Sequence, residues 1–90
     1  MAQHPADDAV PHEVRRFLSE ELQVNVNDPD FRDDLNLFDA GFLDSLGFAR
    51  LVNHLETRYG IRFEPQELFV EEMMSVSGIA RILTDRRKAS

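Results

Sequence analysis

Two residues that can cap a helix stand side by side in the stretch AGFLDSLGFARLV, residues 40–52. A helix start needs one capping side chain, and aspartate and serine are about equally good caps. If Asp44 caps the helix, Ser45 becomes its first residue and its hydroxyl faces outward. The free N–H groups and the positive dipole end of a helix N-terminus favour a phosphate ester there. The pattern therefore makes Ser45 a candidate for modification. The alternative is that Ser45 is only a helix cap.

The segment before this serine has to position it. Residues 24–44 show no sustained period, but they carry eight large apolar side chains among their Asn, Asp, Pro and Gly residues. A solvent-exposed linker would not hold so many apolar groups. We therefore expect an ordered loop pinned across the core, with a short helical turn around Pro29–Asp34. Gly41 and the apolar pair Phe42–Leu43 then deliver Ser45 from this loop.

Apolar spacings of three and four predict the helices on either side of the loop. The first runs from about Asp8 to Leu22 or Gln23, with Asp7 or Asp8 as its cap and Pro11 in its first turn. The second runs from Leu46 to Tyr59 and ends at Gly60. Its expected buried stripe, widened by two further side chains, consists of Ala49, Val52, Leu55, Tyr59, Phe48 and Leu51.

The rest of the chain predicts one short and one long helix. Pro65 can open a short helix that continues to about Phe69, and Ser75 can cap a last helix. No segment alternates with the period of a strand. We predict an all-α domain, a small bundle of three main helices and one short helix, over residues 8–85. A disordered lead-in (1–7) precedes it and a basic tail (86–90) follows it.

Composition narrows the classes of function. Seventeen acidic residues against ten Lys and Arg give a formal net charge of −7 in 90 residues, which disfavours nucleic-acid binding. The chain has no cysteine, so a thiol nucleophile and a zinc–thiolate site are excluded. It also shows no secretory signal and no apolar run long enough to span a membrane. We expect a cytoplasmic monomer whose acidic surface favours basic patches on partner proteins.

Neither a metal site nor a catalytic centre can be assembled from the sequence. Asp28 and Asp30 match the first and third positions of a calcium loop, but Asp33 replaces its required glycine and Asp39 its final glutamate. A serine hydrolase would need glycines around Ser45 and a paired histidine. The histidines at positions 4, 12 and 54 show no metal spacing and are interpreted as surface residues without partners.

The longer stretch LFDAGFLDSLGFARLVNHLETRYGI, from Leu37 to Ile61, resembles the carrier-protein family. This family comprises acyl carrier proteins and the peptidyl or aminoacyl carrier domains of assembly-line synthesis. The similarity covers roughly residues 35–83. The tripeptide Asp44-Ser45-Leu46 alone is a weak signal. It becomes strong when L-F-D-x-G precedes it and a helix of the form L-x-x-x-L-E-x-x-[YF]-G-[IV] follows it.

The resemblance implies a covalent 4′-phosphopantetheine, transferred from coenzyme A to Ser45 within the Asp44-Ser45-Leu46 motif. The terminal thiol of that arm carries an acyl or aminoacyl group as a thioester, so the protein needs no cysteine and performs no catalysis. The implied partners are a phosphopantetheinyl transferase, an adenylating or acyl-loading enzyme, and the enzymes that take the cargo onward. Tethering raises the effective concentration of the cargo at each of these enzymes.

The flanks of the motif point to one branch of the family. The glycine that follows Asp-Ser-Leu here, Gly47, resembles the pattern of discrete D-alanyl carrier proteins and of related carriers that serve stand-alone adenylating enzymes. Arg50 and Arg58 against Glu56 give the second helix a net charge of +1, so fatty-acid synthase enzymes are expected to use this carrier poorly. The alternative is that both arginines are merely solvated. The candidate partner contacts on this helix and before it are Phe42, Leu46, Gly47, Arg50, His54 and Arg58.

Several alternatives stay open at this level. Leu46 is either a docking anchor or a core residue. Phe48 either lines a channel for the cargo or fills the bundle, and the second is favoured. The chain is a stand-alone protein or a domain of a larger synthase, in a natural-product, nonribosomal-peptide, polyketide or D-alanyl-type pathway. The competing function is a carrier-shaped interaction module that is never modified.

Overall fold

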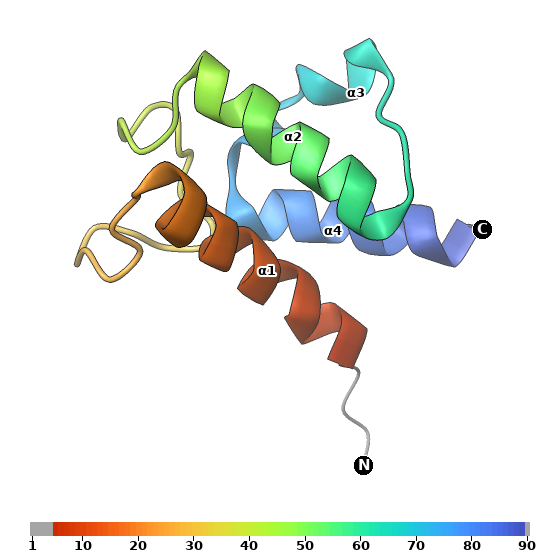
Figure 1. Cartoon of the computed structure of the whole chain (residues 1–90), viewed down its shortest axis with the longest axis horizontal. Coiled ribbons are helices and arrows are strands. Elements are labelled where there is room, and N and C mark those ends of the chain that lie inside the picture. Colours follow the sequence, from red (N-terminus) through yellow and green to blue (C-terminus); the bar gives the residue numbers. More distant parts are fainter. Residues whose placement is uncertain (1–4, 90) are drawn as a thin grey trace.

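The computed structural model describes residues 5–89 and the side chains of residues 9–86. Its elements are α1 (Pro5–Leu22), α2 (Ser45–Tyr59), the short α3 (Pro65–Leu68), the 3₁₀ helix η1 (Glu71–Met74) and α4 (Val76–Ala89). Residues 5–89 contain no strand. The predicted all-α bundle of three main helices, one short helix and a long first loop is confirmed (Figure 1).

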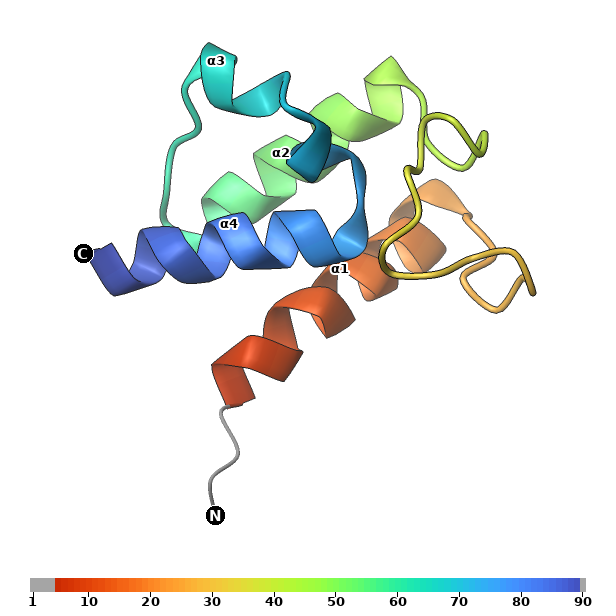
Figure 2. The same cartoon turned by 180° about the vertical axis from the view of Figure 1, so that it is seen from behind.

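The helices stack so that α4 packs against α1 on one side and against η1 on the other. α2 lies across α1 and α4, and α3 lies beyond α2 on the side away from α1 (Figures 1 and 2). The long loop between α1 and α2 closes one end of the bundle, and the beginning of α2 lies at that end. No helix in the described residues is long and apolar enough to cross a membrane.

The predicted start of the first helix differs from the structure. α1 begins at Pro5, so Asp7 and Asp8 lie inside the helix and neither is its cap, and residues 5–7 of the predicted lead-in are helical. Pro11 therefore falls in the second turn, where its missing N–H removes a backbone hydrogen bond. At the other end α4 continues to Ala89 and includes most of the predicted basic tail. Residues 1–4 and 90 lie outside the described part of the chain.

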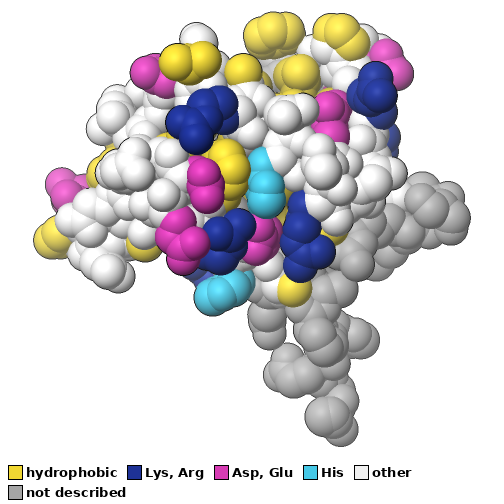
Figure 3. Space-filling model, viewed as in Figure 1, with side chains coloured by type: hydrophobic (Ala, Val, Ile, Leu, Met, Phe, Trp, Pro, Cys, Tyr) yellow, Lys and Arg dark blue, Asp and Glu magenta, His cyan; other side chains and the backbone are white. Residues whose placement is uncertain are grey.

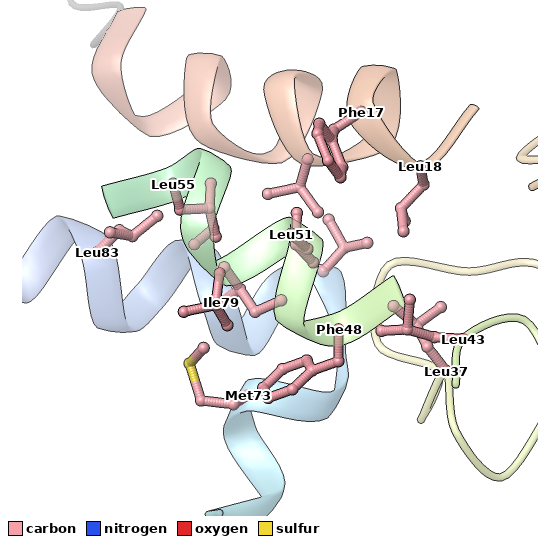
Figure 4. Close-up of a cluster of buried hydrophobic side chains, with 14 of the residues drawn as sticks. Phe17, Leu18, Leu37, Leu43, Phe48, Leu51, Leu55, Met73, Ile79 and Leu83 are labelled. Carbon is pink, nitrogen blue, oxygen red and sulfur yellow. The ribbon is translucent and has the colours of Figure 1, made fainter. Parts of the chain in front are cut away.

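One apolar cluster joins all the elements (Figure 4). The apolar spacing in α1 predicts one core face of Val10, Val14, Phe17, Leu18 and Leu22. The first four are buried, and Leu22 is partly buried against the core. The predicted stripe of α2 is confirmed at Phe48, Leu51, Val52 and Leu55, which are buried, but Ala49 is exposed and Tyr59 only half-buried. The buried side chains and glycine of α2 are Gly47, Phe48, Leu51, Val52 and Leu55.

The long loop is pinned to the core as expected. Leu37 is fully buried, and its N–H donates to the carbonyl of Met74 in η1 at 2.7 Å. The N–H of Ser77 in α4 donates to the carbonyl of Asp33, whose carboxylate pairs with Arg15 of α1. The short helical turn expected at Pro29–Asp34 is replaced by two hydrogen-bonded turns, from 28 to 31 and from 32 to 35. The loop is therefore tied to three helices and holds the start of α2 in place.

Candidate functional site

Ser45 is the first residue of α2 and its side chain is exposed. Asp44 has an extended backbone (φ −114°, ψ −179°), and its Oδ1 accepts a hydrogen bond of 2.8 Å from the N–H of Gly47. The prediction that Asp44 caps the helix and leaves Ser45 free is confirmed. Within the described residues the Ser45 hydroxyl takes part in no hydrogen bond. It is a free oxygen at the positive end of a fifteen-residue helix.

The chain immediately before Ser45 is rigidly held. The N–H groups of Phe42 and Leu43 both donate to the carbonyl of Leu37, at 2.9 and 3.1 Å. Gly41 turns the chain with φ +82°, a backbone conformation that residues other than glycine rarely adopt. Leu43, two residues before the serine, is buried in the core. The position of the hydroxyl is thus set by the core and by the Asp44 cap together.

An apolar groove of about 610 Å³ lies beside Ser45, between α2 and the segment that carries α3 and η1. Ser45 belongs to its rim, and Asn53 and Glu56 are the other polar residues that line it. Phe48 is buried in the core cluster, as the favoured alternative expected, and it lines this groove as well. The apolar residues of the groove are Phe38, Phe48, Ala49, Val52, Leu68, Phe69 and Met74.

A second hollow, of about 400 Å³, lies beside the start of α2. It brings together four of the predicted contact residues: Phe42, Leu46, Gly47 and Arg50. Leu46 is 72% exposed, which rules out the alternative that it is a core residue. An exposed leucine next to Ser45 suits a docking contact.

Gly47 was wrongly expected to face outward. It is buried, and a Cβ at this position would lie 3.1 to 3.3 Å from Leu43, Asp44 and Leu22. The glycine lets the first turn of α2 approach these side chains closely, including the carboxylate that caps the helix. Its role is therefore local packing at the cap.

The other two predicted contacts, His54 and Arg58, do not line the hollow. The histidine was expected to have no partner, and this was wrong. Its Nε2 lies 2.6 Å from Glu13 of α1, and its ring stacks on Phe17 with 4.6 Å between centroids. It therefore joins α2 to α1. Arg50 also reaches α1, at 3.9 Å from Glu21, while Arg58 lies over the ring of Tyr59.

Glu13 is the charged centre of this contact between the two helices. Arg16 binds its carboxylate with Nε at 3.1 Å and Nη2 at 2.7 Å. That pair of hydrogen bonds, together with a smaller contribution from His54, lowers the pKa of Glu13 to about 2, against the opposing effect of burial. Because the folded pKa lies below the ordinary value of 4.5, the contact stabilises the fold at neutral pH. This contribution is lost as the pH falls from about 4.5 toward 2.

Replacing Glu13 with glutamine is expected to cost about 2 kcal/mol of unfolding free energy at pH 7, because two charge-assisted hydrogen bonds are weakened. The difference from the unaltered protein should shrink steadily below pH 4.5 and vanish near pH 2. Urea unfolding at a series of pH values measures both. Glu20→Gln is the matched control, because Glu20 binds the same arginine at 2.8 Å but is 62% exposed. Equal losses in the two variants at pH 7 would contradict the role given to Glu13.

Comparison with known proteins gives a single family. The model of the family described as "Phosphopantetheine attachment site" matches residues 12–83. Proteins named "D-alanyl carrier protein" from Streptococcus thermophilus and Streptococcus gordonii are each 34% identical over 80 residues, which is 89% of this chain and 98% of theirs. The one from Streptococcus sanguinis is 34% identical over 77 residues, 86% of this chain and 94% of its own. No solved structure matches the chain significantly.

The chain therefore belongs to the phosphopantetheine-attachment family. It is a carrier protein, similar over most of its length to D-alanyl carrier proteins, and its cofactor is a covalently attached 4′-phosphopantetheine. The exposed, unbonded hydroxyl of Ser45 and the apolar groove beside it fit such an arm. A carrier of this kind interacts with the enzymes that modify it and with those that handle its acyl groups.

Proposed function

We propose that Ser45 is the attachment residue and that the protein carries an acyl or aminoacyl group between biosynthetic enzymes. The observation that carries this proposal is that Asp44 and Ser45 have different roles at the start of α2. Asp44 caps the helix, so the hydroxyl of Ser45 is left exposed and without a hydrogen bond. The bound arm would supply a terminal thiol that holds the cargo as a thioester.

In the attachment reaction the carrier supplies the attacking oxygen, and the transferase supplies the base. The Ser45 oxygen attacks the phosphorus of coenzyme A that bears the pantetheine, and an oxygen–phosphorus bond forms. The bond from that phosphorus to the rest of the pyrophosphate breaks, and adenosine 3′,5′-bisphosphate leaves. The serine proton passes to a base of the transferase. The carrier contributes a fixed oxygen at a helix N-terminus, where the dipole stabilises the new phosphodiester.

The partners proposed for this site are a phosphopantetheinyl transferase, an adenylating or acyl-loading enzyme, and the enzymes that take the cargo onward. The protein itself has no catalytic role in this proposal. Leu46, Phe42 and Arg50 line the hollow beside Ser45 and are the proposed contacts, whereas His54 is committed to the contact with α1. We further propose a monomeric, cytoplasmic domain over residues 8–85.

Similarity to D-alanyl carrier proteins favours a small aminoacyl cargo loaded by a stand-alone adenylating enzyme. Nonribosomal-peptide, polyketide and other natural-product pathways use the same arm and are the alternatives for this chain. The loading enzyme selects the cargo. Trials with D-alanine, other amino acids and acyl groups on the modified protein therefore decide between these pathways.

The proposal is tested by intact mass after incubation with coenzyme A and a broad-specificity phosphopantetheinyl transferase. We expect the mass to rise by one phosphopantetheine, and fragmentation to place the added mass on Ser45 and on none of Ser19, Ser75 and Ser77. An unchanged mass, with the transferase active on another carrier, would contradict it. That result would favour the unmodified interaction module.

A further inference from the structure

The apolar groove beside Ser45 follows one face of α2 toward the far end of that helix. The residues of α2 that line it after Ser45 recur at spacings of three and four: Phe48, Ala49, Val52, Asn53 and Glu56. Such spacings place side chains on one side of a helix. Figure 3 shows apolar side chains along this edge of the molecule, over the beginning of α2 and over α3. The groove therefore leads from the serine into the second half of α2.

The opposite wall of the groove is held at both of its ends. Leu68 packs against the core, and Glu67 holds α3 to α4 by accepting two hydrogen bonds of 3.1 Å from Arg86. Further along the chain, Met73 in η1 is fully buried. Phe69 lies between these anchors, where it lines the groove and is 80% exposed. Because this wall is fixed in advance, a ligand that enters the groove has little of the protein to order.

The far end of the groove differs from the rest because it carries a charge. Apart from Ser45, the polar residues that line it are Asn53 and Glu56. The half-buried Glu56 accepts the N–H of Phe63 with Oε2 at 2.9 Å. Among the described side chains, none of the cations pairs with this carboxylate. A negative charge beside apolar side chains is stabilised by a cation that enters the groove.

The length of the groove matches the length of the arm. Glu56 follows Ser45 by eleven residues, which is about 16 Å along the axis of α2. From phosphorus to sulfur, the chain of 4′-phosphopantetheine corresponds to about four peptide residues, or roughly 15 Å when extended. An arm that runs along the groove from Ser45 thus brings its sulfur level with Asn53 and Glu56. The amino group of an aminoacyl thioester lies only a few bonds beyond that sulfur.

We infer that Glu56 and Asn53 bind the ammonium group of an aminoacyl cargo at the end of the arm. An α-amino group is mainly protonated at pH 7, so it can pair with the Glu56 carboxylate and donate to the amide oxygen of Asn53. An acyl group without nitrogen leaves that carboxylate without a partner. This inference rests on the proposed modification of Ser45. It makes the groove a site that distinguishes aminoacyl from plain acyl groups.

The first test compares two cargoes of nearly the same shape. Alanyl and isobutyryl groups differ in that an ammonium replaces a methyl, and a broad-specificity phosphopantetheinyl transferase can attach either one with the arm from its coenzyme A derivative. Analogues with an amide in place of the thioester prevent hydrolysis. In NMR spectra, the backbone N–H of Phe63 and the side-chain amide of Asn53 should shift when the alanyl group is present. The isobutyryl form should show shifts at most about a third as large, because it lacks the ion pair.

The second test removes the charge at the end of the groove. Glu56→Gln keeps an oxygen that can accept the Phe63 N–H, but it should lower the population of the docked alanyl group about threefold, as expected when a partly exposed ion pair is lost. The same NMR shifts measure this population. Glu71→Gln is the matched control, because it removes the same charge from an exposed glutamate that does not line the groove. It should leave the shifts unchanged.

The outcomes separate the cargo site from the carrier function. Equal shifts with alanyl and isobutyryl groups on the modified protein would overturn the ammonium site, and the carrier function would stand. Equal effects of Glu56→Gln and Glu71→Gln would overturn it as well. Should Glu56→Gln fail to fold, the two cargoes on the unaltered protein still decide. If the unaltered protein gains no mass, both the function and the cargo site fall.

Discussion

Replacing Ser45 with alanine is expected to abolish the gain of phosphopantetheine and to leave the stability of the protein unchanged. The hydroxyl is the proposed attachment group, but it makes no hydrogen bond within the described residues and does not cap α2. Intact mass after incubation with the transferase and coenzyme A measures the first effect. Thermal unfolding of the unmodified proteins measures the second.

The neighbouring aspartate provides the opposite variant. Asp44→Ala removes the 2.8 Å bond to the N–H of Gly47 and is expected to cost about 1 kcal/mol, a fall in melting temperature of about 5 °C. At the end of a long incubation it should still carry the cofactor. Asp44→Asn should recover the stability, because asparagine caps a helix about as well as aspartate. Should Ser45→Ala be the variant that loses stability, the roles of the two residues would have to be exchanged.

The parts of this site that the sequence predicted depend on contacts between near neighbours in the chain. A cap needs only a suitable side chain three residues before the N–H that it binds. Asp44 bonds Gly47 in this way, and Ser75 bonds the N–H of Gly78 at 3.1 Å. Gly60 ends α2 with φ +66° for an equally local reason. These features, and the exposed serine that follows from them, could be read from the residues alone.

The parts that could not be predicted depend on how the helices face one another. The spacing of apolar residues placed Ala49 in the same buried stripe as Leu51, and only packing against the neighbouring helices decides that Leu51 is buried and Ala49 is exposed. The same geometry brings His54 of α2 to Glu13, forty-one residues earlier. Phe69 is exposed because its neighbours on both sides are anchored. The spacing of apolar residues in the sequence does not indicate this exposure.

At Gly78, helix propensity and tertiary packing predict opposite effects of a substitution on stability. On propensity alone, replacing a glycine inside α4 with alanine should stabilise the helix by about 1 kcal/mol. In the structure, a Cβ at position 78 would lie 1.9 Å from the carbonyl oxygen of Glu72 and 2.7 Å from its carbonyl carbon. Both are backbone atoms, so no side-chain rotation can relieve the overlap. We expect Gly78→Ala to destabilise the protein by about 2–3 kcal/mol.

The loss arises because η1 would have to move away from α4, and η1 anchors two other contacts. Met73 is fully buried, and the carbonyl of Met74 accepts the N–H of Leu37 that pins the long loop. Thermal unfolding should show a fall in melting temperature of roughly 10–20 °C. Gly60→Ala is the matched control: its Cβ meets nothing within 4 Å, so only the strain of its positive φ, about 1 kcal/mol, should appear. A Gly78→Ala protein as stable as the unaltered one would mean that η1 does not pack against α4 as closely as described.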